Sequence, residues 1–224
     1  MTFVEAGRLP ARPVGRDSMQ ERVYRQLVQM ILDGELEPGR TMTIGGIAEA
    51  FQVSAMPVRE ALHRLSAAKA LTVVTGRSVG IPPLTIARLT DLCRVRVEVE
   101  GIAAEWAAAN VDAATLGRLD GLIQHMSAAA GTADHPGFLP LNRSFHFAVY
   151  EAAGSDTLLA LIESLWLQIG PYLSLLRGSG NWRTANRQHQ AMRDALARRD
   201  GKAARAALCA DIEEAAALLE PLLG

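Results

Sequence analysis

Residues 54–65 read Ser-Ala-Met-Pro-Val-Arg-Glu-Ala-Leu-His-Arg-Leu, and they limit the possible folds more than any other segment. Ser54 is a good helix N-cap, and Pro57 falls in the first turn, where backbone N–H groups lack intrahelical partners. Arg59 follows near the amino end, where its side chain can reach a DNA base edge. The segment predicts the recognition helix of a helix-turn-helix, because its apolar residues recur at helical spacing and would pack onto a small core: Val58, Leu62 and Leu65.

Two further helices are expected before this recognition helix. Apolar residues at helical spacing predict the first over residues 18–32, and Asp33-Gly34 ends it. A turn follows at residues 37–39, and Thr43 is expected to cap a short second helix. Three helices in this order, with a tight turn before the third, are typical of a helix-turn-helix domain.

A β-hairpin, or wing, is expected after the recognition helix. Residues 71–75 form a short β-branched run, Gly76-Arg77 supplies a turn, and residues 78–81 can return as the second strand. Two consecutive prolines then break the chain where a stiff linker is expected. The predicted organisation is a flexible tail over 1–15, a winged helix-turn-helix over 16–81, a linker over 82–84 and an all-helical domain over 85–224.

Beyond the linker the sequence predicts helices and no convincing strand. Capping residues and Gly or Pro breaks divide this part into six helical segments, one of them broken or kinked near Gly170-Pro171. The connections are short, so neighbouring helices should run antiparallel. The expected fold class is therefore mainly α, with an N-terminal winged helix-turn-helix and a C-terminal antiparallel six-helix bundle.

Composition excludes several classes of protein. The net charge is −1, although residues 1–80 hold ten basic and eight acidic residues (+2) and residues 81–224 hold thirteen and sixteen (−3). Cys93 and Cys209 lie far apart, which argues against a disulfide framework. We expect a cytoplasmic protein without a membrane segment, because no apolar run reaches spanning length and no signal peptide is evident. No Gly-rich phosphate-binding motif supports a dinucleotide or P-loop enzyme.

With these features in view, the chain resembles the GntR superfamily of bacterial transcription regulators. The N-terminal resemblance is carried by residues 31–39, Ile47-Ala48, residues 54–65 and the Gly76 wing. The C-terminal part is similar to the FadR branch, whose FCD domain binds small effectors in a six-helix bundle; its matching stretches are residues 96–100, residues 142–146 and His189 through Asp200. The resemblance covers roughly residues 18–220 and implies a ligand-responsive homodimeric regulator of double-stranded operator DNA, expected to be a repressor.

Several residues are candidates for contact with that DNA. Arg59 could donate two hydrogen bonds to guanine, worth ~1–3 kcal/mol of discrimination, or it could be a solvated surface arginine. Lys69 and Arg64 could contact phosphates or be plain surface cations. Relatives usually carry Arg where this chain has Ala55, which removes one expected contact and indicates a different operator. The candidate DNA-binding residues are Arg40, Thr43, Ser54, Met56, Arg59, Arg64, Gly76 and Arg77.

The resemblance also implies a metal site between helices. Asn142 and His146 lie four residues apart and share a helix face, while His189 and Asp211 fall in two later helices. FCD domains typically have Asp, His, His and His at the matching positions. The set found here would suit Zn, Ni, Mn or Fe and leave positions open for an effector or water. The alternative is that the two histidines line a metal-free pocket.

Arg96 is the candidate for effector binding. It precedes Glu100 by four residues, so one interpretation is an intrahelical ion pair worth ~0.3–0.5 kcal/mol. The other interpretation, which the resemblance favours, is an inward-facing guanidinium that pairs with the carboxylate of a small organic acid.

A metal-dependent enzyme is the alternative function. His146, His189 and Asp211 have the composition of a two-histidine, one-carboxylate iron centre. No general base accompanies them, and an enzyme would give no reason for the N-terminal module. The sequence therefore favours the regulator.

Overall fold

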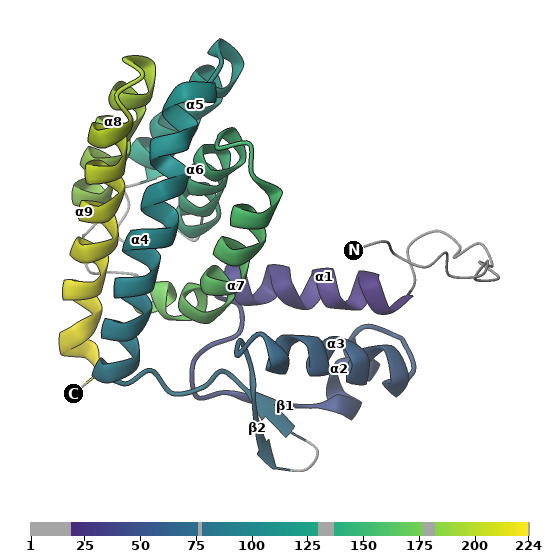
Figure 1. Cartoon of the computed structure of the whole chain (residues 1–224). Coiled ribbons are helices and arrows are strands. Elements are labelled where there is room, and N and C mark those ends of the chain that lie inside the picture. The colour runs from purple at the N-terminus through teal and green to yellow at the C-terminus, as the bar shows by residue number, and fades with distance from the viewer. Residues whose placement is uncertain (1–18, 76–77, 130–136, 177–181, 224) are drawn as a thin grey trace, which may run out of the picture.

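The computed structural model describes residues 19–75, 78–129, 137–176 and 182–223, which form two helical regions joined by an extended segment (Figure 1). The N-terminal elements are α1 (Met19–Leu32), β1 (Thr41–Thr43), α2 (Ile44–Ala50), α3 (Ala55–Ala67), β2 (Thr72–Thr75) and β3 (Ser78–Gly80). The C-terminal elements are α4 (Ile86–Asn110), α5 (Ala113–Ala129), α6 (Phe138–Ala152), α7 (Asp156–Leu173), α8 (Trp182–Ala197) and α9 (Gly201–Leu219), with 3-10 turns at Ser174–Leu176 and Glu220–Leu222. The predicted fold class is confirmed.

The N-terminal core is formed where α1 packs against α3. Both helices bury one face at the helical spacing expected from the sequence: Val23, Leu27 and Ile31 on α1, and Val58, Leu62 and Leu65 on α3. Removing these side chains from water is the main force that holds the two helices together. The opposite face of α3, which includes Arg59, stays exposed.

The hairpin is larger than predicted, because a third strand joins it. The sheet order is β1-β3-β2, and both pairs are antiparallel. Strand β1 was not predicted, since three residues directly before a helix carry too little periodicity to identify a strand. Gly80 permits this pairing, because a Cβ there would lie 2.8 Å from the carbonyl oxygen of Arg40.

The predicted helix starts are confirmed at several caps. Thr43 Oγ1 accepts a hydrogen bond from the backbone N–H of Gly46 at 3.0 Å, and Thr85 Oγ1 accepts one from Arg88 at 3.2 Å. Ser54 occupies the N-cap of α3 in an extended conformation, but its hydroxyl makes no capping hydrogen bond. The exposed Ser54 side chain is thus not used to start the helix.

The C-terminal region is a bundle in which α4 lies alongside α9, and α8 packs against α9 and α5 (Figure 1). Small residues allow α4 and α9 to approach closely: buried alanines face the junction, and a Cβ on Gly201 would lie 2.8 Å from the Glu105 carbonyl oxygen. The three helices α6, α8 and α9 carry the predicted metal ligands into one interior.

Helix α7 differs from two expectations. The predicted break near Gly170-Pro171 is wrong, because α7 remains α-helical to Leu173 and the 3-10 turn follows at Ser174; the alternative, a kink, stays a prediction. Helix α7 is also long and apolar enough to meet the length and composition of a membrane span, contrary to the sequence expectation. Its apolar side chains include Ile162, Trp166 and Ile169, which are buried against α1, α4 and α6. This packing explains the composition of α7 as that of a core helix.

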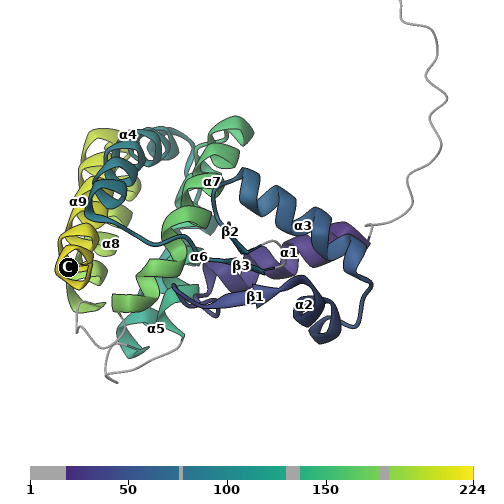
Figure 2. The same cartoon turned by 90° about the horizontal axis from the view of Figure 1, so that it is seen from below.

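The two regions meet where α7 lies against α1 (Figure 2). Position 170 is close-packed, since a Cβ there would lie 3.4 Å from Leu32 Cδ2. Tyr172 donates its hydroxyl hydrogen to the Pro82 carbonyl oxygen. Arg88 Nη2 donates to the Lys69 carbonyl oxygen at 3.2 Å and to Gln168 Oε1 at 3.3 Å, so polar contacts also tie the N-terminal region to the bundle.

Candidate metal centre and nucleic-acid interface

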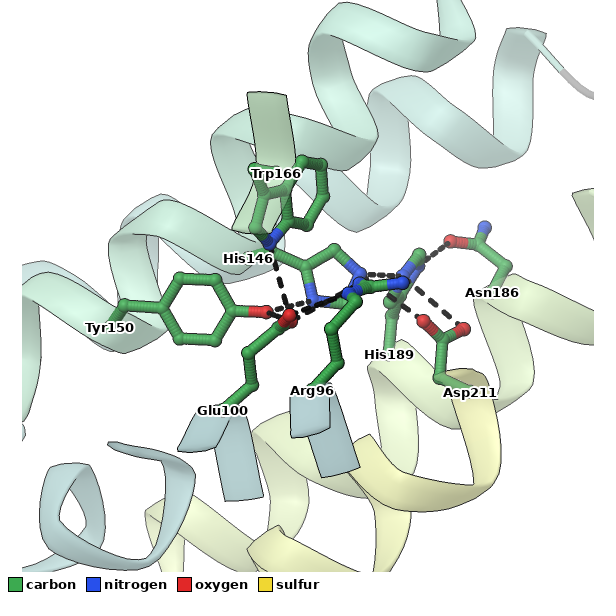
Figure 3. A network of polar contacts seen from close by, with 8 residues as sticks. All are labelled: Arg96, Glu100, His146, Tyr150, Trp166, Asn186, His189 and Asp211. Carbon is green, nitrogen blue, oxygen red and sulfur yellow. Dashed lines mark hydrogen bonds and ion pairs between the residues drawn. The ribbon is translucent and has the colours of Figure 1, made fainter. Parts of the chain in front are cut away.

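Three predicted metal ligands converge in the bundle: His146 from α6, His189 from α8 and Asp211 from α9 (Figure 3). Their ligand atoms all lie within 4.8 Å of one another. His146 Nε2 is 3.2 Å from His189 Nε2 and 3.2 Å from Asp211 Oδ2. His189 Nε2 is 3.8 Å from Asp211 Oδ1. Residues up to 65 positions apart in the sequence are therefore gathered at one point.

These distances fit a divalent metal ion. Two nitrogens each ~2.1 Å from a metal are ~3.0–3.4 Å apart when they subtend an octahedral or tetrahedral angle. The separation of the two Nε2 atoms, 3.2 Å, lies within that range. Two imidazoles and one carboxylate are also a donor set that suits transition metals.

Burial governs the charge of the ligands. It lowers the pKa of His189 to about 4, against the opposing attraction of Asp211, so this imidazole is neutral near pH 7. Burial alone would raise the pKa of Asp211, but the hydrogen bond with His146 and the nearby imidazoles outweigh it and lower that pKa below its ordinary value. A neutral imidazole and an ionised carboxylate are the forms in which these side chains bind metals.

Asn142, the predicted fourth ligand, lies one turn before His146 on α6 and lines the same cavity as His146 and Asp211. The cavity leaves about 40 Å³ of space for water, enough for one or two molecules. Its other walls are largely apolar and include Phe138, Leu139, Trp166, Leu173 and Ile212. Asn142 therefore lines the same cavity as two of the converging ligands, and its place as the fourth ligand stays a prediction.

The structure confirms one of the two interpretations offered for Arg96, the ion pair, and the effector contact stays a prediction. Arg96 Nε lies 2.6 Å from Glu100 Oε1, so the ion pair is confirmed, but both side chains are buried rather than exposed. Arg96 also lines the cavity, as does His146. The modest energy expected for an exposed pair therefore does not apply here.

The sequence did not identify the polar network around Glu100. Its Oε2 accepts hydrogen bonds from the Tyr150 hydroxyl at 2.5 Å and from Trp166 Nε1 at 3.2 Å (Figure 3). Burial raises the pKa of Tyr150 well above its ordinary value, so the hydroxyl keeps its proton. No spacing signal links these residues, because they come from three helices; only the pair Arg96 and Glu100 is visible as an i,i+4 motif.

The exposed face of α3 forms the candidate nucleic-acid interface. Met56 is 61% exposed, and Arg59 and Ser54 are also exposed near the start of the helix. An open groove of about 460 Å³ runs between α3 and the hairpin. Its polar lining residues are Arg59, Glu60, His63, Ser66, Thr75 and Ser78. Apart from Glu60, whose carboxylate accepts and would repel a phosphate, these side chains can donate hydrogen bonds to a DNA backbone.

Other predicted DNA contacts have partners within the protein. Arg64 Nη1 lies 2.7 Å from Glu21 Oε2, and its guanidinium stacks 3.5 Å above the Tyr24 ring, so it ties α3 to α1. Arg40 is exposed and lies 3.8 Å from Glu37 Oε2. Thr43 is exposed although its hydroxyl caps α2, and Lys69 is an exposed residue in the left-handed turn after α3. The predicted wing residues, Gly76 and Arg77, lie outside the described residues, as does the predicted tail over 1–15.

A winged helix-turn-helix joined to a helical bundle with a buried polar site defines the class of ligand-responsive DNA-binding regulators. Residues 19–81 match the family of bacterial regulatory proteins named gntR, and residues 91–214 match the FCD domain. The chain therefore belongs to the GntR family of transcription regulators, in the branch that carries an FCD domain.

Individual relatives agree with this assignment. The chain is 31% identical over 159 residues to the HTH-type transcriptional regulator McbR of Escherichia coli K12, covering 71% of this chain and 72% of McbR. The solved structure of E. coli McbR covers 93% of this chain and 100% of its own, with a TM-score of 0.86 and 27% identity. A putative GntR regulator from Rhodococcus sp. RHA1 shares the fold, with a TM-score of 0.74, 24% identity and coverage of 89% of this chain and 96% of its own.

The matched families and relatives are transcription regulators, which leaves the enzyme alternative without support. The triad of His146, His189 and Asp211 is present, but it belongs to a regulatory domain. The chain is a DNA-binding transcription regulator.

Proposed function

We propose that this regulator binds one divalent metal ion in its FCD domain and that the metal site controls operator binding. The observation that carries the proposal is the convergence of two Nε2 atoms and one carboxylate within 4.8 Å, in a chain whose other half is a winged helix-turn-helix. Asn142 supplies an amide oxygen or holds a bound water as the fourth ligand. Zn, Ni, Mn or Fe fits this set, and at least one coordination position stays open.

The effector in this proposal is a small organic acid. Arg96 lines the same cavity as Asn142, His146 and Asp211, so a carboxylate bound at the open metal position could also pair with the guanidinium. Because the cavity leaves only about 40 Å³ for water, it would have to widen to admit the rest of the acid. The effector can shift the protein between two arrangements only through its different affinity for each of them. We assign the protein as a repressor that leaves its operator when the effector binds.

The DNA-binding role of α3 is proposed for the exposed residues at its start. Arg59 would read a base pair, while Met56 would contact a base edge and Ser54 a phosphate. Phosphate contacts beside the recognition helix would come from Arg40 and Thr43. The wing contact would come from Gly76 and Arg77. Arg64 would have to break its ion pair with Glu21 and its stacking on Tyr24 to reach a phosphate. We therefore propose that Arg64 contributes less to DNA affinity than Arg59. The domain limits proposed for these roles are 16–81 for DNA binding and 85–224 for the effector, joined by the linker 82–84, in a cytoplasmic protein.

A homodimer is proposed through the face that α4 and α9 share. A groove of about 780 Å³ lies there, and its lining exposes Ile86 (46%) and Val95 (41%) among charges of both signs, such as Arg94, Glu98 and Glu213. A twofold axis pairs such a face with itself, so a second copy supplies matching apolar and charged groups. Light scattering should show the wild-type protein as a dimer and Val95→Glu as a monomer that unfolds at a similar temperature.

Metal analysis combined with operator binding tests the proposed function. Protein purified without chelator should contain about one metal per chain, and His146→Ala or His189→Ala should lose it. His125→Ala is the matched control, because His125 is exposed on α5 away from the cavity. Binding to the protein's own upstream region should then be compared with and without chelator across a panel of organic acids.

An acid that stabilises the protein only when metal is present, and that changes operator affinity, supports the proposal. The proposal fails if the purified protein holds no metal and cannot take up Zn²⁺, Ni²⁺, Mn²⁺ or Fe²⁺. It also fails if metal removal and every acid leave operator binding unchanged.

A further inference from the structure

The two ring nitrogens of His146 face different groups. Nε2 lies at the proposed metal site, and Nδ1 lies near a buried tyrosine. Its Nδ1 lies 3.3 Å from the Tyr150 hydroxyl oxygen. Tyr150 donates its own hydrogen to Glu100 Oε2 at 2.5 Å, and Glu100 can only accept (Figure 3). The tyrosine oxygen is therefore left to accept, and the hydrogen in the Nδ1 contact must come from His146.

His189 is held in an equivalent way by an amide. Its Nδ1 lies 3.4 Å from Asn186 Oδ1 (Figure 3). The amide nitrogen of Asn186 donates to Ser127 Oγ at 2.6 Å and to the Ile123 carbonyl oxygen at 3.4 Å. The carbonyl acceptor fixes which end of the amide is nitrogen, so the oxygen faces His189 and accepts from its Nδ1–H.

Both histidines therefore carry hydrogen on Nδ1. A proton that His146 Nε2 shares with Asp211 in the metal-free protein would leave when the metal binds, so that in the metal-bound form both Nε2 atoms present a lone pair. The two Nε2 atoms lie 3.2 Å apart beside the Asp211 carboxylate, so three electron-rich groups face one point. We propose that Tyr150 and Asn186 are positioning residues that hold the two imidazoles in the Nδ1–H form, so that both Nε2 atoms are directed at the bound metal.

The proposal rests on the metal site put forward above, and it adds a cause for the site's geometry. Tyr150 acts with the carboxylate of Glu100, which is on α4, and Asn186 acts with Ser127, which is on α5. Helices α4 and α5, which supply no metal ligand, thereby orient the two histidine ligands that α6 and α8 supply. Outer contacts of this kind typically change metal affinity by ~10–100-fold when removed.

The first test measures metal affinity by competition with a chromophoric chelator, using Zn²⁺ and Co²⁺. Tyr150→Phe and Asn186→Leu should each raise the Kd by about 10–100-fold. Asn186→Asp keeps an acceptor for Nδ1–H and should bind more tightly than Asn186→Leu. Matched controls are Tyr172→Phe, which removes the hydroxyl bound to Pro82, and Asn110→Leu, which removes the amide bound to Ala153; both should leave the Kd unchanged.

The second test is ¹⁵N NMR of the two imidazoles, in metal-free and Zn²⁺-loaded protein. Each Nδ1 should carry a hydrogen that exchanges slowly with solvent. Tyr150→Phe should remove the protection of the His146 hydrogen alone, and Asn186→Leu that of His189 alone, a selective change that general destabilisation would not produce.

An unprotonated Nδ1 on either ring, or wild-type metal affinity in both variants, would overturn the proposal. If wild-type protein binds no metal, the proposed function fails, while the Nδ1 signals of the metal-free protein still decide whether Tyr150 and Asn186 fix the tautomers.

Discussion

Arg143 on α6 forms an ion pair with Asp33 at the end of α1, with Nη1 3.1 Å from Oδ1. Their side chains are only 16% and 17% exposed, so this contact is mostly shielded from solvent. Arg143 is adjacent to Asn142 and three residues before His146. The helix that carries two candidate metal ligands is therefore in direct contact with the DNA-binding region.

Replacing Arg143 should weaken the connection between the two regions. Arg143→Met leaves Asp33 without this cation near a helix C-terminus, where a negative charge is unfavourable, and should cost ~1–3 kcal/mol of unfolding free energy. If the metal site acts through α6, the ratio of operator affinities with and without metal should also move toward one. Urea unfolding and operator titrations measure the two effects.

The control for this variant is Arg118→Met on α5, which removes an exposed ion pair with Glu151. It should change stability by less than ~1 kcal/mol and leave the metal response intact. An Arg143→Met protein that keeps the full metal response would show that the signal takes another path.

The buried pair of Arg96 and Glu100 should be far more sensitive than a surface pair. Arg96→Met leaves the Glu100 carboxylate buried beside Tyr150 and Trp166 and should destabilise the protein by ~3–5 kcal/mol. Adding Glu100→Gln removes the unpaired charge and should recover part of the loss. Chemical denaturation of the single and double variants measures the difference, with Arg187→Met as the exposed control. Equal losses in the single and double variants would contradict this account.

Metal-free protein should lose stability as the pH falls from about 6.5 toward 4. Over this range the unfolded state takes up a proton at His189, whose ordinary pKa is 6.5, while burial holds the folded pKa near 4. The contribution is therefore complete above pH 6.5 and amounts to ~3 kcal/mol across the range. Denaturant unfolding in the presence of chelator should show this slope, and His189→Gln should flatten it. A slope shared by wild type and His189→Gln would assign the dependence to other groups.

Arg59→Ala should relax sequence discrimination without changing the fold. The side chain is exposed on α3 and packs in no core, so the unfolding free energy should change by less than ~0.5 kcal/mol. Loss of a bidentate base contact should lower discrimination by ~1–3 kcal/mol at one base pair in each half-site. Titration of single-base operator variants at fixed salt measures this, with Arg118→Ala as the control. A uniform loss of affinity across all variants would instead indicate a phosphate contact.

Local sequence rules predicted much of the fold correctly. The caps at Thr43 and Thr85 and the periodic apolar residues of α1 and α3 depend on neighbours within a few positions, so the sequence alone indicates them. Strand β1 could not be predicted this way, because it exists only through pairing with β3, almost forty residues later. Helix α7 also continued past Pro171, where its contacts with α1 and the rest of the bundle outweigh the local preference to break.

The features of the candidate site also fall into two groups: those that helix spacing predicts and those that depend on how the helices pack. The i,i+4 spacing of Asn142 and His146, and of Arg96 and Glu100, follows from helix geometry and was visible in the sequence. Tertiary structure alone decided that the Arg96 pair is buried and that Arg64 packs on Tyr24. Helix spacing places Tyr150 and Asn186 beside the two histidines, but only tertiary packing supplies the Glu100 and Ser127 contacts that hold them. The physical reason is that helix spacing sets which residues share a face. Burial, charge and tautomer depend on which other helix covers that face, and this is settled only when the helices pack.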